Sequence, residues 1–254
     1  MKQHSMLQIV LGWILTPIHI VLFFVIMLSF DLFQRLAGIF GYYPQKLVLD
    51  LMNKILLLNI RLAGTRFQVD IAEFPNLDRP VILVSNHQSM YDIPLIMNVF
   101  SKHHPKFIAK VELGSFVPSI SCAIKPLEHC VIDRKDPASA IPTIEKFGKN
   151  IASKNWMACI FPEGTRGRDG NLKKFKSGGL KALLKAMPEA VIIPVVIDGS
   201  WELLKYKLMP IPFGVKFILK SLPVIQASNL DLDTATQDLE KIINSTLQEI
   251  RARN

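Results

Sequence analysis

The sequence contains few cysteines, only Cys122, Cys130 and Cys159 in 254 residues. An odd number of thiols in or beside apolar runs argues against a disulfide framework, so we expect small buried side chains in a reducing compartment. Metal-ligand spacing is also missing, because the pair His103-His104 has no neighbours at zinc spacing. We therefore predict no metal site.

Several motifs of common enzyme chemistry are missing as well. The sequence has no Walker A loop and no G-x-G-x-x-G, which argues against nucleotide-driven phosphoryl transfer and dinucleotide chemistry. It has no G-x-S-x-G, and no cysteine sits at a comparable strand-to-turn position, so a covalent serine or cysteine nucleophile is not expected. We find no internal repeat and no low-complexity tract. No tightly bound cofactor is predicted.

Acidic residues are outnumbered, 21 against 30 Lys and Arg, and the net charge of +9 predicts attraction to anionic partners. No recognised nucleic-acid module and no run of interleaved aromatic and basic residues is present, which argues against nucleic acid. Half of the residues are hydrophobic and the mean hydropathy is positive, so the protein is expected to contact lipid. The lysines between residues 173 and 185 are read as a solvated helix face, with attraction of phosphate or anionic lipid as the functional alternative.

The amino-terminal part is strongly apolar. Residues 6–30 are long enough to cross a hydrocarbon core, although Pro17 interrupts them midway. After a turn with Gly41 and Pro44, the segment 46–60 has polar residues at helical spacing and a wide apolar face. The two helices either dip into one leaflet and return, or the first one spans the membrane. In the spanning case the positive charges beyond the first segment put the rest of the chain in the cytosol, and both arrangements place it at a cytosolic membrane face.

The remaining chain alternates strand-like and helix-like segments. Strands are expected at FQVDI, VILVS, KFIAK, HCVID, WMACIF, VIIPVVI and VKFIL, and an amphipathic helix is expected at the carboxyl end. This alternation predicts an α/β fold with a mainly parallel sheet flanked by helices. We assign residues 1–62 to membrane-associating helices and residues 63–254 to one α/β domain.

One motif stands at the end of the predicted strand VILVS. There the apolar run stops at Asn86-His87, and Asp92 follows in what should be the first turn of a helix. If the chain turns between them, Asp92 can accept a hydrogen bond from the imidazole of His87. Such a carboxylate fixes the tautomer and leaves the other ring nitrogen free to accept a proton. His87 is therefore our candidate general base.

A second polar cluster, PEGTR, follows the predicted strand WMACIF. Because ligands of parallel α/β sheets bind at the carboxyl ends of strands, this cluster and His87 are expected at the same edge. The guanidinium of Arg166 suits a phosphate or carboxylate, and Thr165 and nearby backbone amides add donors. Lys110 and Arg134 also directly follow apolar runs and are weaker candidates. Pro194 interrupts hydrogen bonding in its strand and therefore predicts an edge or bulged strand there.

In order, NHQSMYD, VIDR, FPEGTR and VIIPVVI resemble the four sequence blocks of the glycerolipid acyltransferases of the 1-acylglycerol-3-phosphate acyltransferase family. The resemblance covers about residues 80–225. It implies acyl transfer from acyl-CoA or acyl carrier protein to lysophosphatidic acid, giving phosphatidic acid. By position it makes His87 and Asp92 the catalytic pair. The same resemblance assigns acceptor binding to Arg134, Glu163, Gly164 and Arg166, with Lys110 as a looser match, and acyl-donor or acyl-chain binding to Pro194.

The sequence departs from this family in one place, since Glu128-His129-Cys130 stands where a small residue usually precedes the arginine of the second block. The acceptor can therefore be another lysophospholipid or a lyso-ornithine lipid. A rival from another class is a membrane-bound scaffold that binds anionic lipid without catalysis. The sequence does not choose between acyl-CoA and acyl carrier protein, and it leaves chain length and oligomeric state open.

Overall fold

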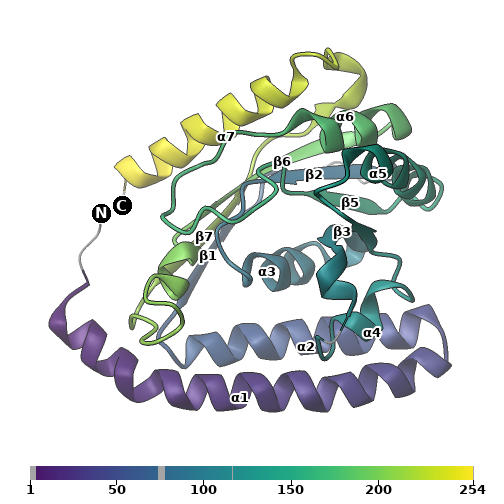
Figure 1. Cartoon of the computed structure of the whole chain (residues 1–254). Coiled ribbons are helices and arrows are strands. Elements are labelled where there is room, and N and C mark those ends of the chain that lie inside the picture. Colours follow the sequence, from purple (N-terminus) through teal and green to yellow (C-terminus); the bar gives the residue numbers. More distant parts are fainter. Residues whose placement is uncertain (1–3, 74–77, 116, 254) are drawn as a thin grey trace.

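In a computed structural model that describes residues 4–73, 78–115 and 117–253, the chain forms an eight-stranded sheet with helices on both faces (Figure 1). The strands are β1 (Arg66–Asp70), β2 (Val81–Ser85), β3 (Pro105–Lys110), β4 (Cys130–Ile132), β5 (Met157–Ile160), β6 (Val191–Asp198), β7 (Lys216–Ser221) and β8 (Ile225–Gln226). The α-helices are α1 (Met6–Ile39), α2 (Tyr42–Arg61), α3 (Asp92–Val99), α4 (Ser121–Ile124), α5 (Pro137–Ala152), α6 (Ser177–Ala186) and α7 (Ala235–Ala252).

The sheet is mainly parallel, as predicted. Its strand order is β1-β7-β6-β2-β5-β3-β4, with β8 paired to β6 beside β7. Among the strands of the described residues, only the pairings of β6 with β7 and with β8 are antiparallel. All seven predicted strands are present. The two-residue strand β8 was not predicted, because so short a segment has no periodicity to detect.

The edge prediction for Pro194 is wrong, since β6 is an interior strand between β2 and β7. The fold tolerates the proline because β6 has no continuous partner on that side. Antiparallel pairing with β7 begins at Val195, and pairing with β8 ends at Ile192. The missing N–H of Pro194 therefore falls between two partner strands, while its carbonyl accepts a hydrogen bond from Leu222 N at 2.9 Å.

The core has one hydrophobic layer on each face of the sheet. Alternate residues of the central strand β2 contribute to the two layers, Val81 and Leu83 to one and Ile82 and Val84 to the other. A strand that is buried on both faces needs this continuous apolar sequence. The layer with Ile82 and Val84 also contains residues of α5, α6 and α7. Cys130 and Cys159 are buried free thiols, and Cys122 is a half-buried one.

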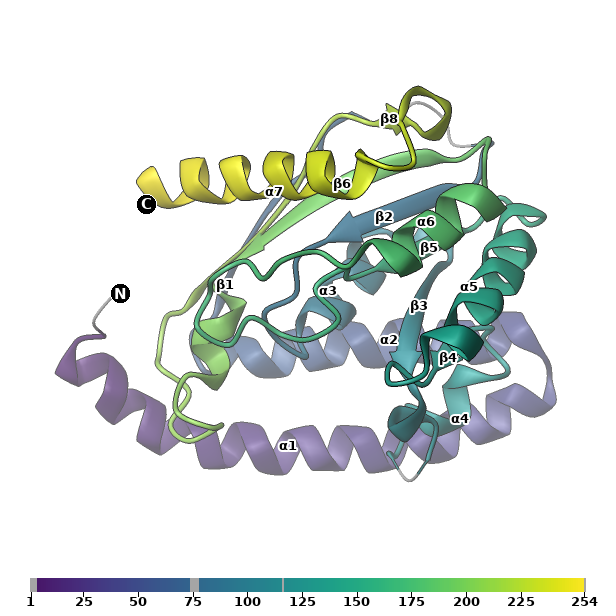
Figure 2. The ribbon, with the colours of Figure 1, turned by 45° about the horizontal axis from the view of Figure 1, so that its top comes forward.

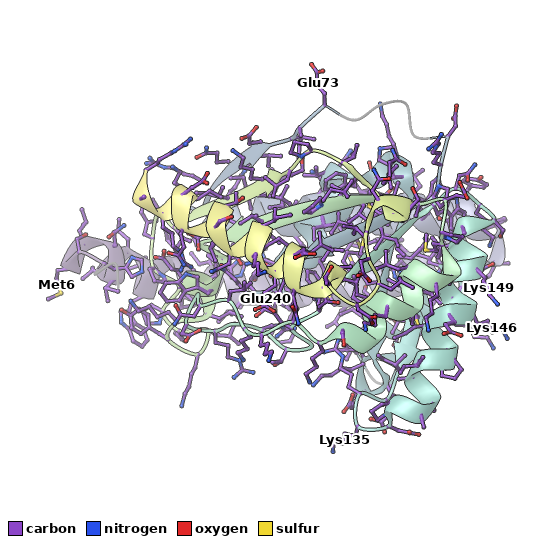
Figure 3. The ribbon with its side chains drawn as sticks, turned by 90° about the horizontal axis from the view of Figure 1, so that it is seen from above. Met6, Glu73, Lys135, Lys146, Lys149 and Glu240 are labelled. Carbon is purple, nitrogen blue, oxygen red and sulfur yellow. The ribbon has the colours of Figure 1, made fainter. Side chains whose placement is uncertain are left out.

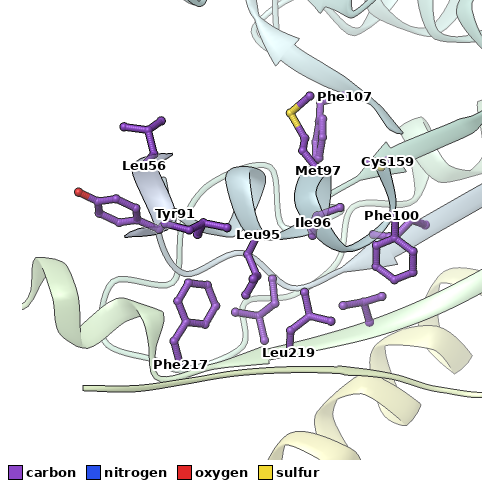
Figure 4. Packing of buried hydrophobic residues seen from close by; sticks show 14 of the residues in the cluster. Leu56, Tyr91, Leu95, Ile96, Met97, Phe100, Phe107, Cys159, Phe217 and Leu219 are labelled. Carbon is purple, nitrogen blue, oxygen red and sulfur yellow. The ribbon is translucent and has the colours of Figure 1, made fainter. Parts of the chain in front are cut away.

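The other layer lies under the sheet, where α3 packs between β7 and α2. Figure 4 shows Tyr91 and Leu95, at the start of α3, between Leu56 of α2 and the ring of Phe217 and side chain of Leu219 in β7. Burying large apolar side chains here contributes about 1.5–3 kcal/mol each. This packing fixes the start of α3, and therefore the turn that precedes it.

The two amino-terminal helices form an antiparallel hairpin beneath α3, and α1 is the outer helix (Figure 1). Helix α1 continues through Pro17 and runs to Ile39. Polar contacts attach it to the body at both ends and in the middle. Gln8 Nε2 donates to the carbonyl of Phe213 at 3.0 Å, and Ile211 N donates to Thr16 Oγ1 at 2.8 Å. Near the other end, Gln34 Nε2 donates to the carbonyl of Ser119 at 3.0 Å.

The opposite face of the hairpin is apolar and exposed. Exposed large hydrophobic side chains of α1 and α2 include Trp13, Phe24, Phe33 and Leu47. Of the residues that the structure describes, α1 is the one helix long and apolar enough to cross a membrane. At 1.5 Å per residue its 34 residues extend about 51 Å, well beyond a hydrocarbon core of about 30 Å.

Candidate active site

His87 and Asp92 meet at the carboxyl end of β2. His87 lies in the turn after the strand, and Asp92 is the first residue of α3. Nδ1 of His87 lies 2.8 Å from Oδ2 of Asp92. Because a carboxylate oxygen only accepts, Nδ1 carries the proton, and Nε2 of the neutral ring keeps its lone pair. Among the described residues none hydrogen bonds to Nε2, which is therefore available to take a proton.

The carboxylate of Asp92 is completely buried and surrounded by donors. Oδ2 accepts hydrogen bonds from the backbone N–H groups of Gln88 at 2.7 Å and Ser89 at 2.8 Å, besides that from His87. Oδ1 accepts one from Ser200 Oγ at 2.6 Å. These bonds and the amino end of α3 stabilise the negative charge. Asp92 thus both orients the imidazole and closes the turn between β2 and α3.

Ser200 was not predicted, because it lies 108 residues after Asp92 in the chain. It reaches the site through a glycine turn at the end of β6. Gly199 has a φ of +83°, and a Cβ at that position would lie 1.9 Å from the carbonyl oxygen of Lys216. Glycine is therefore required there. The sequence feature that could have indicated Ser200 is the Gly-Ser pair that directly follows an apolar strand.

Glu163 joins the second polar cluster to the first. Its Oε1 accepts from His87 N at 2.7 Å and its Oε2 accepts from Lys173 N at 3.0 Å. Burial raises the pKa of Glu163 to about 7, although both backbone donors oppose this. In return, the carbonyl of His87 accepts from Gly167 N at 2.7 Å. Both carboxylate oxygens are thus engaged within the protein, which favours an indirect role in the predicted binding of the acceptor.

Asn86 ties the end of β2 to the end of β6. Its Nδ2 donates to the carbonyl of Ile197, and its Oδ1 accepts from Ile197 N, both at 2.8 Å. The side-chain amide of Asn86 thus makes the two hydrogen bonds to Ile197 that the backbone of a neighbouring strand would make. This clamp was not predicted from sequence, although Asn86 was recognised as the end of the strand.

The imidazole of His87 rests on a stack of aromatic rings. Its centroid lies 4.1 Å from that of Phe161, with an angle of 13° between the planes. Phe161 in turn stacks on Phe107, with centroids 5.9 Å apart. Phe161 directly follows β5, so the same sheet edge supplies the ring that supports the histidine. Together with Asp92, this stack restricts the imidazole to one orientation.

Arg166 lies on the same sheet edge, half-buried, and lines an apolar cavity of about 180 Å³. Burial lowers the pKa of Arg166, and the nearby charge of Asp92 opposes this. The cavity also touches Met90 and Tyr91, which belong to the turn after His87. His87, Asp92 and Arg166 therefore lie at one edge of the sheet, and their predicted roles stay predictions.

The apolar cavity runs between the sheet domain and the helical hairpin. Its lining is mostly hydrophobic and includes Phe23 and Met27 of α1 and Leu49 of α2. The polar residues in the lining, besides Arg166, are Asn53, Ser119 and His129. The hairpin is held beside the site through His19 of α1. With Nδ1 of His19 donating to the carbonyl of Asn59 at 3.3 Å, its Nε2 accepts from the hydroxyl of Tyr91 at 2.8 Å.

The other predicted residues occupy different places. Arg134 follows β4 and donates to the carbonyls of Gly164 and, at 3.4 Å, Ile108. Burial lowers the pKa of Arg134, and the nearby charge of Arg166 lowers it further. Lys110 and Thr165 are exposed at the same sheet edge. Pro194 is buried within β6, and its predicted role in acyl-donor or chain binding stays a prediction.

These features define an α/β domain with a buried histidine–aspartate pair, a neighbouring arginine cluster and an apolar helical hairpin beneath. Residues 66–198, just over half of the chain, match the sequence profile of the acyltransferase family. The chain belongs to this family.

The curated relatives include proteins named 1-acyl-sn-glycerol-3-phosphate acyltransferase. The protein from Cocos nucifera is 34% identical over 158 residues, which cover 61% of this chain and 49% of the relative. The alpha form from Ovis aries is 25% identical over 199 residues, 78% of this chain and 68% of the relative. The chain spans about half the length of the first of these proteins.

A solved structure shares the fold. The crystal structure of the 1-acyl-sn-glycerophosphate acyltransferase from Thermotoga maritima matches with a TM-score of 0.75 and 24% sequence identity. The match covers 97% of this chain and 99% of that one. The amino-terminal helices are therefore part of a fold that another protein shares, and not an addition to it.

Proposed function

We propose that the protein transfers an acyl group from acyl-CoA or acyl carrier protein to the sn-2 hydroxyl of 1-acylglycerol-3-phosphate, giving phosphatidic acid. The observation that carries this proposal is the His87–Asp92 pair, 2.8 Å apart, at one sheet edge with Arg166 and an apolar cavity. A base, a cationic group for phosphate and an apolar cavity for an acyl chain are what this reaction needs. The names of the relatives support the same reaction.

The chemistry follows from the free nitrogen of His87. Nε2 takes the proton of the acceptor hydroxyl while Asp92 stabilises the resulting imidazolium. The hydroxyl oxygen forms a bond to the thioester carbonyl carbon. The carbon–sulfur bond then breaks, and the thiolate leaves with the proton that the imidazolium returns. No acyl-enzyme is required.

The arginines position the acceptor for this step. A phosphate bound by Arg166 and Arg134 brings the neighbouring hydroxyl to a fixed distance from His87, and such positioning contributes several kcal/mol to lowering the barrier. The exposed Lys110 and Thr165 are on the same sheet edge and add further donors for the acceptor. No metal takes part in this scheme.

We further propose that the exposed apolar face of the hairpin lies in one leaflet of a membrane. A helix that is attached to the body along its length, and is about 51 Å long, suits an orientation parallel to the surface better than a span. The lipid acceptor then reaches the cavity from the bilayer. We place the α/β domain at the cytosolic face of that membrane.

The test is a thioester-consumption assay on purified protein in lipid vesicles, with lysophosphatidic acid as acceptor and acyl-CoA or acyl carrier protein as donor. We expect phosphatidic acid to form with at least one donor. Acceptors with other head groups, including lyso-ornithine lipid, measure the preference for a phosphate monoester. Vesicle binding with no thioester consumption for any acceptor would overturn the proposal in favour of a lipid-binding scaffold.

A further inference from the structure

A second cavity, of about 270 Å³, lies on the other face of the sheet from the helical hairpin. It is bounded by α5, α6 and the carboxyl ends of β3, β4 and β5, which Figure 2 shows together on the side away from α1. Its floor is apolar and includes Ile132, Ile144 and Ile160. The volume is close to the lower limit of about 300 Å³ for small-molecule sites.

This cavity reaches the active site through Phe161, which forms part of its lining. The ring of Phe161 is the one on which His87 stacks, with centroids 4.1 Å apart. Phe161 thus separates the cavity from the imidazole, so a molecule in the cavity lies one residue away from the candidate general base. The apolar cavity described above meets the same sheet edge from the hairpin side, at Arg166.

Two cationic side chains stand at the rim, on either side of Gly164. Arg134 donates to the carbonyl of Gly164, and Nζ of Lys176 would lie 3.5 Å from a Cβ at that glycine. Both side chains also line the cavity. Farther out, Lys135 projects near the start of α5 (Figure 3). The entrance is thus positively charged although the interior is apolar.

On the α6 side the cavity is lined by two glycines, Gly178 and Gly179, which leave its space open. A Cβ on Gly178 would meet only Ile141 Cδ1, at 3.7 Å, and one on Gly179 would lie 3.1 Å from Ile160 Cδ1. Side chains at these positions would therefore grow into the cavity. Gly178 is the site where a substitution fills the space with the least disturbance of its surroundings.

We propose that this cavity holds the phosphopantetheine arm of the acyl donor. The inference rests on the proposed acyl transfer. The arm has a phosphate at one end, a branched apolar and amide-containing middle, and the thioester sulfur at the other end. A cationic rim, an apolar interior and an end at Phe161, the neighbour of His87, match these three parts in order.

The position of the cavity supports this occupant rather than the lipid acceptor. The acceptor arrives from the bilayer, on the side of the sheet covered by α1 and α2. The donor arrives from water, on the side covered by α5 and α6. The two substrates then meet at the sheet edge from opposite faces. In this arrangement the acyl chain of a lipid substrate lies in the cavity beside the hairpin and the arm lies in the cavity beneath α6.

Filling the cavity is the test. Gly178→Phe places a ring inside it, and Ile141→Trp enlarges a half-exposed side chain at its edge, which is the variant to use if the first one fails to fold. Asn244→Phe adds the same ring to the exposed face of α7, outside the cavity, and is the matched control. Each variant must melt within a few degrees of the wild type.

The first measurement is binding, without catalysis, of 4′-phosphopantetheine and of CoA by titration calorimetry. We expect the Kd to rise at least tenfold in the filled variants and to stay unchanged in Asn244→Phe. Lys176→Gln should weaken phosphopantetheine but not pantetheine, which lacks the phosphate. Equal affinities in the wild type and in both filled variants would overturn the proposal.

The second measurement varies the donor. With acyl-CoA or acyl carrier protein, whichever the wild type uses, the filled variants should lose at least tenfold in kcat/KM. With an acyl N-acetylcysteamine thioester, which lacks most of the arm, their rates should stay within twofold of the wild type. An equal loss with the truncated donor would show a structural effect and overturn the proposal.

The two proposals fail in different ways. If the wild type binds phosphopantetheine in this cavity but acylates no lysolipid, the proposed acyl transfer is wrong and the proposed phosphopantetheine site is retained. If the wild type makes phosphatidic acid and the filled variants do so equally well with acyl-CoA and acyl carrier protein, the function stands and the site is wrong.

Discussion

Ser200 Oγ donates a hydrogen bond of 2.6 Å to Oδ1 of Asp92, the carboxylate oxygen that His87 does not use. The contact joins the end of β6 to the start of α3, so the orientation of the imidazole depends on three separate parts of the chain. Asp92 is fully buried, and without Ser200 its Oδ1 would lose the hydrogen bond that holds it.

Ser200→Ala should therefore lower kcat about tenfold, which corresponds to about 1.4 kcal/mol, while the KM for both substrates changes little. The loss comes from a less well oriented carboxylate and not from substrate contacts. Steady-state kinetics with the matched control Ser245→Ala, an exposed serine of α7, measure it. A normal kcat in Ser200→Ala would show that three donors suffice to hold Asp92.

Removing the base should be far more damaging. We expect His87→Ala to lower kcat about 10²- to 10⁴-fold with no large change in melting temperature, because general base catalysis is lost while the fold remains. The control is His103→Ala, a half-buried histidine outside the site. A purified His87→Ala protein with a tenth or more of the wild-type rate would contradict the role of His87.

Arg166→Ala should mainly weaken acceptor binding. Losing charge-assisted hydrogen bonds worth about 1.5–3 kcal/mol raises the acceptor KM by about ten- to a hundredfold and leaves the donor KM nearly unchanged. The comparison is Arg168→Ala, an exposed arginine two residues away. An acceptor KM and kcat equal to those of the wild type would remove Arg166 from the site.

Glu163 predicts a specific dependence of stability on pH. Its folded-state pKa of about 7 lies above the ordinary 4.5, so between these values the folded state binds the proton more tightly than the unfolded state. The contribution to stability is therefore fully present below pH 4.5 and is lost as the pH rises through 7. At about 1.4 kcal/mol per pKa unit, its upper limit is about 3 kcal/mol.

Denaturant unfolding of the wild type and Glu163→Gln between pH 4.5 and 8 measures this loss. The difference in free energy of unfolding should shift in favour of the variant as the pH rises, and should level off above pH 7. A difference that does not change with pH would mean that Glu163 is ionised throughout this range in the folded state.

The exposed apolar face of α1 should control membrane binding. Phe24 and Phe33 are 59% and 51% exposed, and changing both to Glu places charge where the proposed orientation needs hydrocarbon contact. We expect the affinity for anionic vesicles to fall at least tenfold in a sedimentation assay. Ile242→Glu, on α7 at the opposite side of the sheet, should bind normally. Equal binding by the double variant would place the membrane surface elsewhere.

The contact between His87 and Asp92 was predictable because the two residues are close in the sequence and a strand-to-helix turn brings them together. The shared sheet edge of His87 and Arg166 was predictable for a related reason. Their strands, β2 and β5, are both apolar runs that end in polar turns, and parallel pairing places such ends side by side.

Contacts between distant segments were not predictable. The bond from Ser200 to Asp92 and the clamp of Asn86 on Ile197 depend on which strand lies beside β2, and periodicity does not reveal strand order. The edge prediction for Pro194 failed because strand order cannot be read from the sequence. The proline does interrupt hydrogen bonding in its strand, as predicted. However, β6 is an interior strand, and Pro194 lies where pairing with β8 has ended and pairing with β7 has not yet begun.

The attachment of α1 by Gln8, Thr16, His19 and Gln34 has a consequence for which lipids the protein can use. A helix held at these points keeps a fixed position relative to the sheet, so in the proposed orientation the protein sets one height of His87 above the leaflet for every lipid. A lysolipid whose free hydroxyl sits at that height can react without being lifted out of its neighbours. The depth of the free hydroxyl in the bilayer would then help to determine which lysolipids react, together with the charge of the head group.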